Sequence, residues 1–131
     1  MRRYLLDEHI PPIFRTQLLY HEPSLTGLAI GDEGTPAKST SDPEILEWCE
    51  QNGFNLITNN QKSMPQHLSD HLAAGRHVPG IFIINLKASI GLIIERLIPI
   101  TGASHEDEYI GEDEYIGEDE YIGQIVFIRL K

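Results

Sequence analysis

The stretch GIFIIN at residues 80–85 decides the fold class, because it is a continuous apolar run between a glycine and an asparagine. A strand whose two faces are both covered by helices has this pattern, as is usual in parallel sheets. A strand with one wet face would alternate apolar and polar residues instead. We therefore predict a buried strand here, in a sheet with helices on both sides.

Further short apolar runs on either side of this stretch alternate with helical patterns. The expected strands are residues 4–7, 25–30 (a weak strand), 55–58, 80–85 and 124–130. The expected helices begin at residues 11 and 41, span residues 65–74, and cover residues 90–98 up to Pro99, which is expected to end the last helix. The alternation predicts an α/β fold with a mainly parallel five-stranded sheet in a single domain, residues 1–131.

The segment SDPE at residues 41–44 marks the start of a helix. Two interpretations remain open: Asp42 is the cap with Pro43 at the first helical position, or Ser41 and Glu44 form a capping box. Gly53 is expected to end this helix, because glycine readily adopts the left-handed conformation. Within the helix lies Cys49, the only cysteine in the chain. We interpret it as a buried small hydrophobe, and a chain without a disulfide as a cytoplasmic protein.

The net charge of -10 is unevenly distributed along the 131 residues. Residues 106–123 read EDEYIG three times and carry nine of the twenty acids and no base, which leaves eleven acids against ten bases elsewhere. No overall basic field therefore exists to hold nucleic acid by counterion release. No apolar run approaches the ~20 residues of a membrane-spanning helix, so we expect no membrane partner.

The hexapeptide repeat at residues 106–123 has an even period, which in a strand places Tyr109, Tyr115 and Tyr121 on one face. The repeat leads directly into the last expected strand. We predict an extended acidic β arm beside that strand, which promotes a homodimer or a higher oligomer. The alternative is a recent sequence expansion without a function of its own.

Polar residues gather where the predicted strands end. Asp7 ends the first strand, and Thr58 and Asn60 lie at the end of the third, while Asp42 and Glu44 begin the helix that leads to it. Sites in parallel sheets lie at the carboxyl ends of strands. Carboxylates with hydroxyl and amide neighbours suit Mg²⁺, which activates water and stabilises phosphoryl charge. In the alternative interpretation, the two helix acids are caps and the asparagines at 59 and 60 form a turn.

These three segments, LLDEH at 5–9, SDPEIL at 41–46 and LITNN at 56–60, resemble the PIN-like superfamily, in particular small bacterial PIN-like proteins related to VapC-type toxins. The resemblance covers about residues 4–100 and the last strand. It implies a three-layer α/β/α fold and a Mg²⁺- or Mn²⁺-dependent ribonuclease site. Many relatives are toxins that a partner antitoxin holds inactive, so RNA and an antitoxin are the expected partners.

The resemblance also implies roles for individual residues. Asp7 matches the metal-binding acid of the first strand, Asp42 or Glu44 matches the second acid, and Thr58 matches a threonine that orients the site. The chain departs from the family where acids usually follow the threonine, because Asn60 and Lys62 stand there. We therefore expect one weakly bound ion and weakened catalysis, for which Glu8 is a candidate compensating acid. The alternative function is a catalytically degenerate interaction module that self-associates through the repeat-bearing edge strand.

Two further constellations are weaker. His67 and His71 lie four residues apart on one predicted helix, a spacing that can hold zinc. A third ligand is not evident, so we expect a solvent-facing pair. Lys62, Arg76 and His77 are candidates to line a phosphate path near the end of the third strand, with scattered surface charges as the equal alternative.

Overall fold

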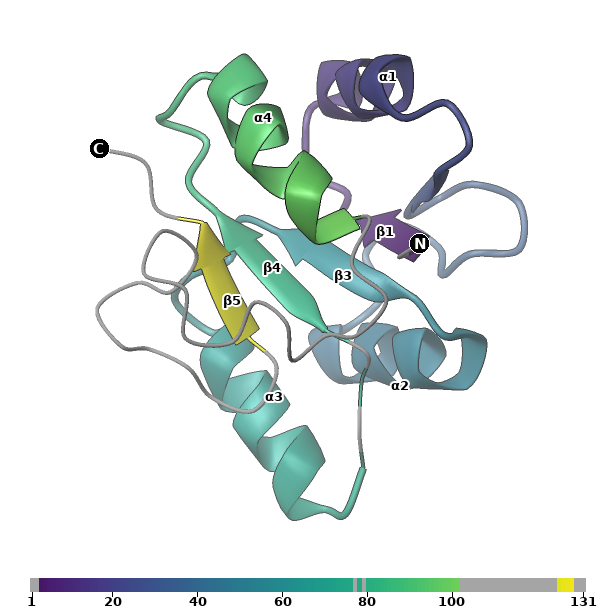
Figure 1. Ribbon diagram of the computed structural model, residues 1–131. Helices are drawn as coiled ribbons and strands as arrows, with labels where there is room; N and C mark the ends of the chain where they lie inside the picture. Colours follow the sequence, from purple (N-terminus) through teal and green to yellow (C-terminus); the bar gives the residue numbers. More distant parts are fainter. Residues whose placement is uncertain (1–2, 77, 79, 102–124, 129–131) are drawn as a thin grey trace.

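The computed structural model describes residues 3–76, 78, 80–101 and 125–128 (Figure 1). Strands and helices alternate along the chain. In order, they are β1 (Arg3–Leu6), α1 (Pro12–His21), β2 (Thr26–Ala29), α2 (Asp42–Asn52), β3 (Asn55–Thr58), α3 (Met64–Ala73), β4 (Ile81–Ile84), α4 (Ile90–Thr101) and β5 (Ile125–Ile128). None of these helices is long and apolar enough to cross a membrane.

The strands form one sheet in the order β2-β1-β3-β4-β5, and every neighbouring pair is parallel. This confirms the predicted α/β class and the parallel sheet. The predicted β arm of residues 106–123 lies outside the described residues, and so does His77.

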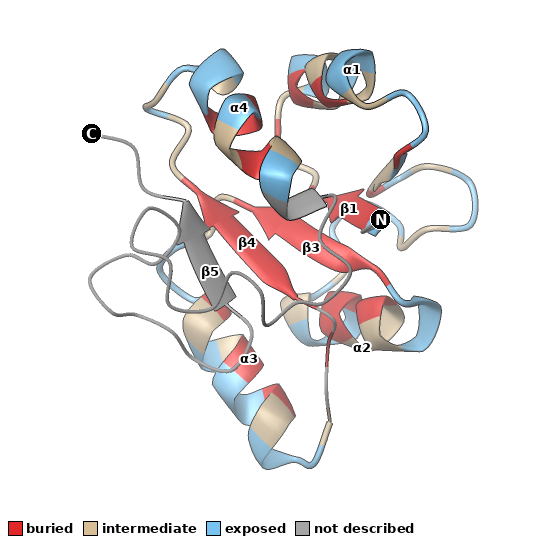
Figure 2. Ribbon diagram, in the orientation of Figure 1, coloured by how far each residue is buried: buried red, intermediate tan, exposed pale blue. Residues whose placement is uncertain are grey.

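Two hydrophobic clusters cover the two faces of the sheet, with α1 and α4 on one face and α2 and α3 on the other (Figure 1). Side chains alternate between these faces along each strand. In β4, Phe82 and Ile84 belong to the cluster with α1 and α4, whereas Ile81 and Ile83 belong to the other. All four are buried, as the continuous apolar run predicts (Figure 2).

Helix α2 begins with Ser41 at the N-cap position and Pro43 in the first turn. The Ser41 hydroxyl donates a 2.9 Å hydrogen bond to Oε1 of Glu44. The pairing of a capping box is therefore present, although it joins two side chains rather than side chain and backbone. Asp42 is inside the helix and is not its cap. Gly53 ends the helix at φ 73°, as predicted.

Helix α4 corrects one expectation, because it continues through Pro99 to Thr101. A proline fits the φ angle of a helix and removes one N–H donor. So close to the end of the helix that loss affects only the last turn. The buried side chains of Ile94 and Leu97 hold the preceding turn against the sheet.

Candidate functional site

The order of the strands creates a switch point between β1 and β3. From β1 the chain crosses to β2 on one side, while β3 lies on the other side of β1. Connections that leave in opposite directions open a crevice at the carboxyl ends of the two strands, which is where ligands bind in open α/β sheets. Asp7 directly follows β1 and Thr58 is the last residue of β3, so both lie at this crevice.

Asp7 is held by both its backbone and its carboxylate. Its backbone N–H donates to the carbonyl of Ile57 at 2.9 Å, which continues the β1–β3 ladder by one residue. Its side chain is 8% exposed. Oδ2 accepts a 2.7 Å hydrogen bond from the Thr58 hydroxyl, and Oδ1 accepts one of 2.8 Å from the N–H of Glu8. The carboxylate is therefore fixed in position.

Thr58 connects Asp7 to the segment that follows β3. Its side chain is fully buried, and its hydroxyl oxygen also accepts a 3.2 Å hydrogen bond from the backbone N–H of Asn60. The hydroxyl therefore acts as a donor to Asp7 and as an acceptor for the segment that follows β3. Asp7, Thr58 and Asn60 are brought together, as the sequence predicts.

Asp42 joins this group through Asn60, whose Nδ2 donates to Asp42 Oδ2 at 3.2 Å. His67 Nε2 lies 3.6 Å from the same oxygen. The pKa of Asp42 is raised from its ordinary value, first by burial and then by the negative charge of Asp7, although His67 and Asn60 act in the opposite direction. The negative charge of Asp7 thus disfavours the ionised form of Asp42, and a bound cation would relieve this repulsion.

Asn60 also forms the turn before α3, as the alternative interpretation of this residue expects. Its Oδ1 accepts a 3.1 Å hydrogen bond from the backbone N–H of Ser63, and its Nδ2 donates to the Ser63 hydroxyl at 2.6 Å. The side-chain oxygen, the atom that binds a hard cation, is therefore engaged in the turn. Asn60 presents a donor to Asp42 instead.

Glu44 is exposed and accepts the hydrogen bond of Ser41, which ties it to the start of α2. Glu8 accepts a 2.7 Å hydrogen bond from the N–H of Ser39, in the loop after β2. In the described part of the chain, no group of three or more histidine, cysteine, aspartate or glutamate side chains is arranged to hold a metal ion. The structure thus brings Asp42, and not Glu44, to Asp7.

The residues present still suit one kind of ion. Mg²⁺ binds through one or two carboxylates and keeps several of its waters, so it does not need a cage of three protein acids. Asp7 and Asp42 supply two carboxylates whose charges act on each other. In the chemistry of its donor atoms, the pair therefore suits a single, largely hydrated Mg²⁺ or Mn²⁺.

The two histidines of α3 have different partners. His71 is buried, and its Nε2 lies 2.8 Å from Oε1 of Glu50 on α2. The expectation of a solvent-facing pair is therefore wrong for His71. His67 instead belongs to the site beside Asp42, which the sequence analysis missed. The available signal was its place one turn into the helix that follows the Thr58–Asn60 segment.

Arg76 does not lie on a phosphate path. Its guanidinium group contacts Glu47 at 2.6 Å and Glu50 at 3.3 Å, both on α2. A cation with two carboxylate partners has little charge left for a ligand. Lys62, in contrast, is exposed and lies at the end of β3, as predicted.

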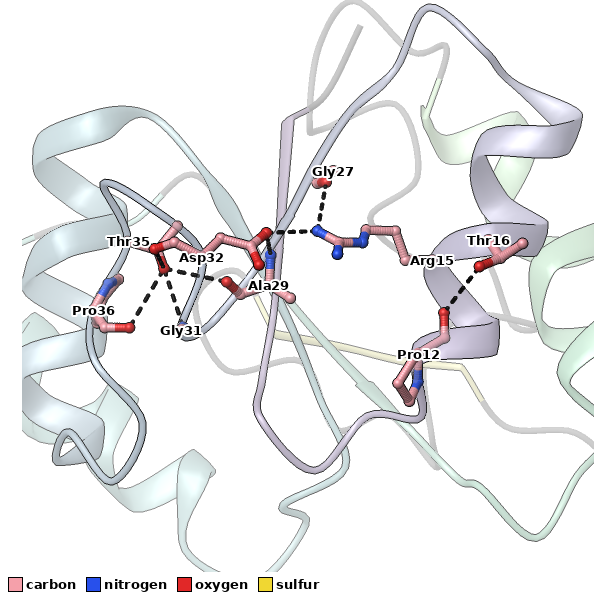
Figure 3. A network of polar contacts seen from close by, with 9 residues as sticks. All are labelled: Pro12, Arg15, Thr16, Gly27, Ala29, Gly31, Asp32, Thr35 and Pro36. Atoms are coloured by element: carbon pink, nitrogen blue, oxygen red, sulfur yellow. Dashed lines mark hydrogen bonds and ion pairs between the residues drawn. The ribbon is translucent and has the colours of Figure 1, made fainter.

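The loop after β2 is fixed by Asp32 (Figure 3). Its Oδ2 accepts hydrogen bonds from the N–H of Ala29 at 2.9 Å and from Arg15 at 2.6 Å. The pKa of Asp32 is lowered, chiefly by the Ala29 N–H and also by Arg15, against the opposing effect of burial. The Thr35 hydroxyl donates to the carbonyl of Asp32 at 2.7 Å and closes the turn. A pocket of about 280 Å³ lies between this loop and Asp7.

Comparisons of the chain with known protein families, with curated proteins and with solved structures found no match. The evidence for a function therefore comes from the switch point, where Asp7, Asp42, Thr58 and Asn60 lie.

Proposed function

We propose that the protein is a divalent-cation-dependent ribonuclease whose cation is held by Asp7 and Asp42. The observation that carries the proposal is the pair itself: hydrogen bonds through Thr58 and Asn60 link two carboxylates from different segments at the switch point, and the charge of one raises the pKa of the other. A carboxylate with a perturbed pKa in a crevice is typical of functional sites.

A Mg²⁺ or Mn²⁺ ion bound at this pair would supply an activated water and stabilise charge on a phosphoryl oxygen. The chain's own residues position the ligands. Thr58 fixes one oxygen of Asp7, and the N–H of Glu8 fixes the other. Because a carboxylate oxygen can accept more than one contact, both remain able to bind an ion. Asn60 and His67 orient Asp42.

The resemblance to the PIN-like superfamily supports the same assignment, because Asp7, Asp42 and Thr58 are positions to which it gives site roles. By that resemblance the activity is of the toxin–antitoxin type, with a partner antitoxin protein that holds the enzyme inactive. Asn60 and Lys62 replace acids of the family pattern, so we propose one ion bound weakly and slow turnover.

A second candidate function is a degenerate module that binds a partner without catalysis. The observation that favours it is the orientation of Asn60, which turns a donor and not an acceptor toward Asp42. Among the described residues no third carboxylate joins the pair. In this second proposal, the module self-associates through the repeat-bearing edge strand and forms a homo-oligomer.

Cleavage of single-stranded RNA with Mg²⁺ or Mn²⁺ tests the ribonuclease proposal. The Asp7→Asn and Asp42→Asn variants should each lower the rate by about 100-fold, the scale of losing an electrostatic catalytic group. Asp70→Asn is the matched control, since Asp70 is an exposed acid that bonds Gln66 on α3. It should cleave as the wild type does.

The Glu44→Gln variant tests which acid of α2 belongs to the site, because the sequence pattern allows either Asp42 or Glu44 and the structure favours Asp42. The structure predicts nearly unchanged cleavage, because Glu44 contacts Ser41 and lies outside the pair. Equal cleavage by wild type and Asp7→Asn, or cleavage by neither, would rule out the ribonuclease and leave the binding module.

A further inference from the structure

A second pocket lies at the carboxyl ends of β3 and β4 and has a volume of about 540 Å³. Among the described residues, two lysines, four side-chain amides and two apolar residues line it, and no carboxylate does. The lining residues are Asn59, Asn60, Gln61, Lys62, Ile84, Asn85, Leu86 and Lys87. We call it the lysine pocket. Its chemistry is that of an anion site, because ammonium groups supply charge and amides supply N–H donors.

Among the described residues, no acid forms an ion pair with a lysine of the lysine pocket. Within residues 3–76, 78, 80–101 and 125–128, neither Lys62 nor Lys87 forms a recorded ion pair or side-chain hydrogen bond, and both are exposed. Arg15 and Arg76 differ, since Arg15 is paired with Asp32 and Arg76 with two glutamates of α2. No described carboxylate therefore neutralises either lysine of the lysine pocket.

The turns that carry the two lysines are built by the backbone around them. Oδ1 of Asn85 accepts a 3.0 Å hydrogen bond from the N–H of Lys87, and the carbonyl of Asn85 accepts one of 3.1 Å from Ala88. On the other side, the N–H of Gln61 donates to the carbonyl of Asn59 at 3.0 Å. Both lysines thus extend from defined turns at the ends of buried strands.

Asn60 connects the lysine pocket to the carboxylate pair, because it lines the pocket and donates to Asp42. A cation-binding pair therefore lies beside an anion-binding pocket. A chain of regularly spaced phosphates matches this arrangement, with one phosphate at the cation and a neighbour at the lysines. An acidic peptide matches this arrangement less well, because it has no phosphoryl group that a cation bound at Asp42 would activate.

We propose that the lysine pocket binds a backbone phosphate of single-stranded RNA and so holds the strand across the carboxylate pair. Its role as a substrate subsite rests on the proposed ribonuclease function. Its affinity for RNA phosphate does not need catalysis, and it can be measured without a metal ion. Lysine binds phosphate as a point charge, so this contact confers affinity for the strand and not for a base sequence.

Fluorescence anisotropy of a labelled oligouridylate in EDTA tests the proposal. The double variant Lys62→Gln/Lys87→Gln should bind about tenfold more weakly than the wild type. The slope of log K against log salt should fall by about 1.4 in magnitude, which is about 0.7 for each lost contact to a single strand. The Lys62→Arg/Lys87→Arg variant keeps both charges and should bind within about twofold of the wild type.

Arg3→Gln is the control for loss of charge alone, because Arg3 is exposed and begins β1, at the end of the sheet opposite the lysine pocket. It should change the affinity for RNA by less than about twofold. Circular dichroism checks that the variants are folded. An oligoglutamate peptide of the same length is the competitor, and it should displace the RNA poorly.

The outcomes separate the two proposals. Unchanged RNA affinity in the double glutamine variant, or equal displacement by oligoglutamate, overturns the lysine pocket even if the protein cleaves RNA. The opposite result is a wild type that cleaves no RNA but binds it in EDTA, with that binding lost only in the variant that replaces Lys62 and Lys87. This result would support the lysine pocket and contradict the ribonuclease proposal.

Discussion

The hydroxyl of Thr58 donates a 2.7 Å hydrogen bond to Oδ2 of Asp7, although 51 positions separate the two residues in the sequence. The register of the sheet produces this contact, because Leu6 of β1 pairs with Ile57 of β3 and each is followed by a polar residue. A buried carboxylate with a hydroxyl donor is thereby placed at the switch point.

Thr58→Val should destabilise the protein, because it removes the hydroxyl that bonds a buried carboxylate and keeps the shape of the side chain. We expect the free energy of unfolding to fall by about 1 to 3 kcal/mol, the usual cost of a lost hydrogen bond to a charged group. Urea denaturation measures it. Thr58→Ser retains the hydroxyl and should lose clearly less; equal losses in both variants would show that the methyl group, not the hydrogen bond, matters.

Asp42→Asn should raise stability at neutral pH while it lowers activity. Burial and the charge of Asp7 disfavour the ionised carboxylate, so the pKa of Asp42 is raised in the folded protein. The neutral amide avoids this cost, and we expect a gain of about 0.5 to 1 kcal/mol in the free energy of unfolding at pH 7.5.

The sign of the pH dependence follows from linkage. Just above the ordinary value of 3.8, folded Asp42 binds its proton more tightly than unfolded Asp42 does. The contribution of Asp42 to the stability of the wild type therefore falls as pH rises from 3.8 through the raised pKa of Asp42. The advantage of Asp42→Asn should shrink as pH falls through that window. An advantage that is the same at pH 7.5 and at pH 3.8 would argue against repulsion as its cause.

Cys49 should be unreactive in the folded protein. Burial raises the pKa of its thiol to about 12, and the negative charge of Asp7 acts in the same direction. Because the thiolate is the nucleophile, almost none is present at pH 8. Ellman's reagent should therefore label the native protein slowly and the guanidinium-unfolded protein at once. Rapid labelling without denaturant would mean that α2 opens readily.

Asp32→Ala should loosen the loop after β2, because Asp32 accepts from both Ala29 and Arg15 (Figure 3). We expect a loss of about 1 kcal/mol, measured by thermal unfolding. The lowered pKa of Asp32 means that its charge stabilises the fold above pH 3.8 and that this contribution disappears as pH falls through the lowered pKa. Asp32→Asn keeps an acceptor and should lose less; a larger loss in Asn than in Ala would contradict this account.

The elements of the fold were predictable because each has a local cause. The apolar run of β4, the SDPE start of α2 and the glycine at position 53 act over a few residues, and the structure confirms them. The end of α4 was not predictable from Pro99 alone. The cost of a proline depends on how many helical bonds follow it and on the packing of the turn before it.

The site was predictable in part. The rule that parallel strands gather ligands at their carboxyl ends was enough to group Asp7, Thr58 and Asn60. The choice between Asp42 and Glu44 was not available, because it depends on which of two acids in one helical turn faces the crevice. The role of His67 depends on how α3 packs beside α2, and the sequence of one helix does not contain that information.

The lysine pocket shows the same limit. In the sequence, Lys62 is notable only as a departure from a family pattern. Nothing in the sequence indicates that Lys87, far away along the chain, lies near it. The pairing of β3 with β4 brings the two turns together, with Thr58 opposite Ile83. Long-range register therefore determines which charges share a pocket.

Calorimetric titration with Mn²⁺ tests the central claim most directly, because it asks whether Asp7 and Asp42 together hold one divalent cation. The account predicts one binding site that saturates at millimolar Mn²⁺ in the wild type and in Asp70→Asn, and that is lost in Asp7→Asn and in Asp42→Asn. Mn²⁺ should also raise the melting temperature of the wild type and of neither pair variant. No heat of binding in the wild type at millimolar Mn²⁺, or equal binding by Asp7→Asn, would contradict it.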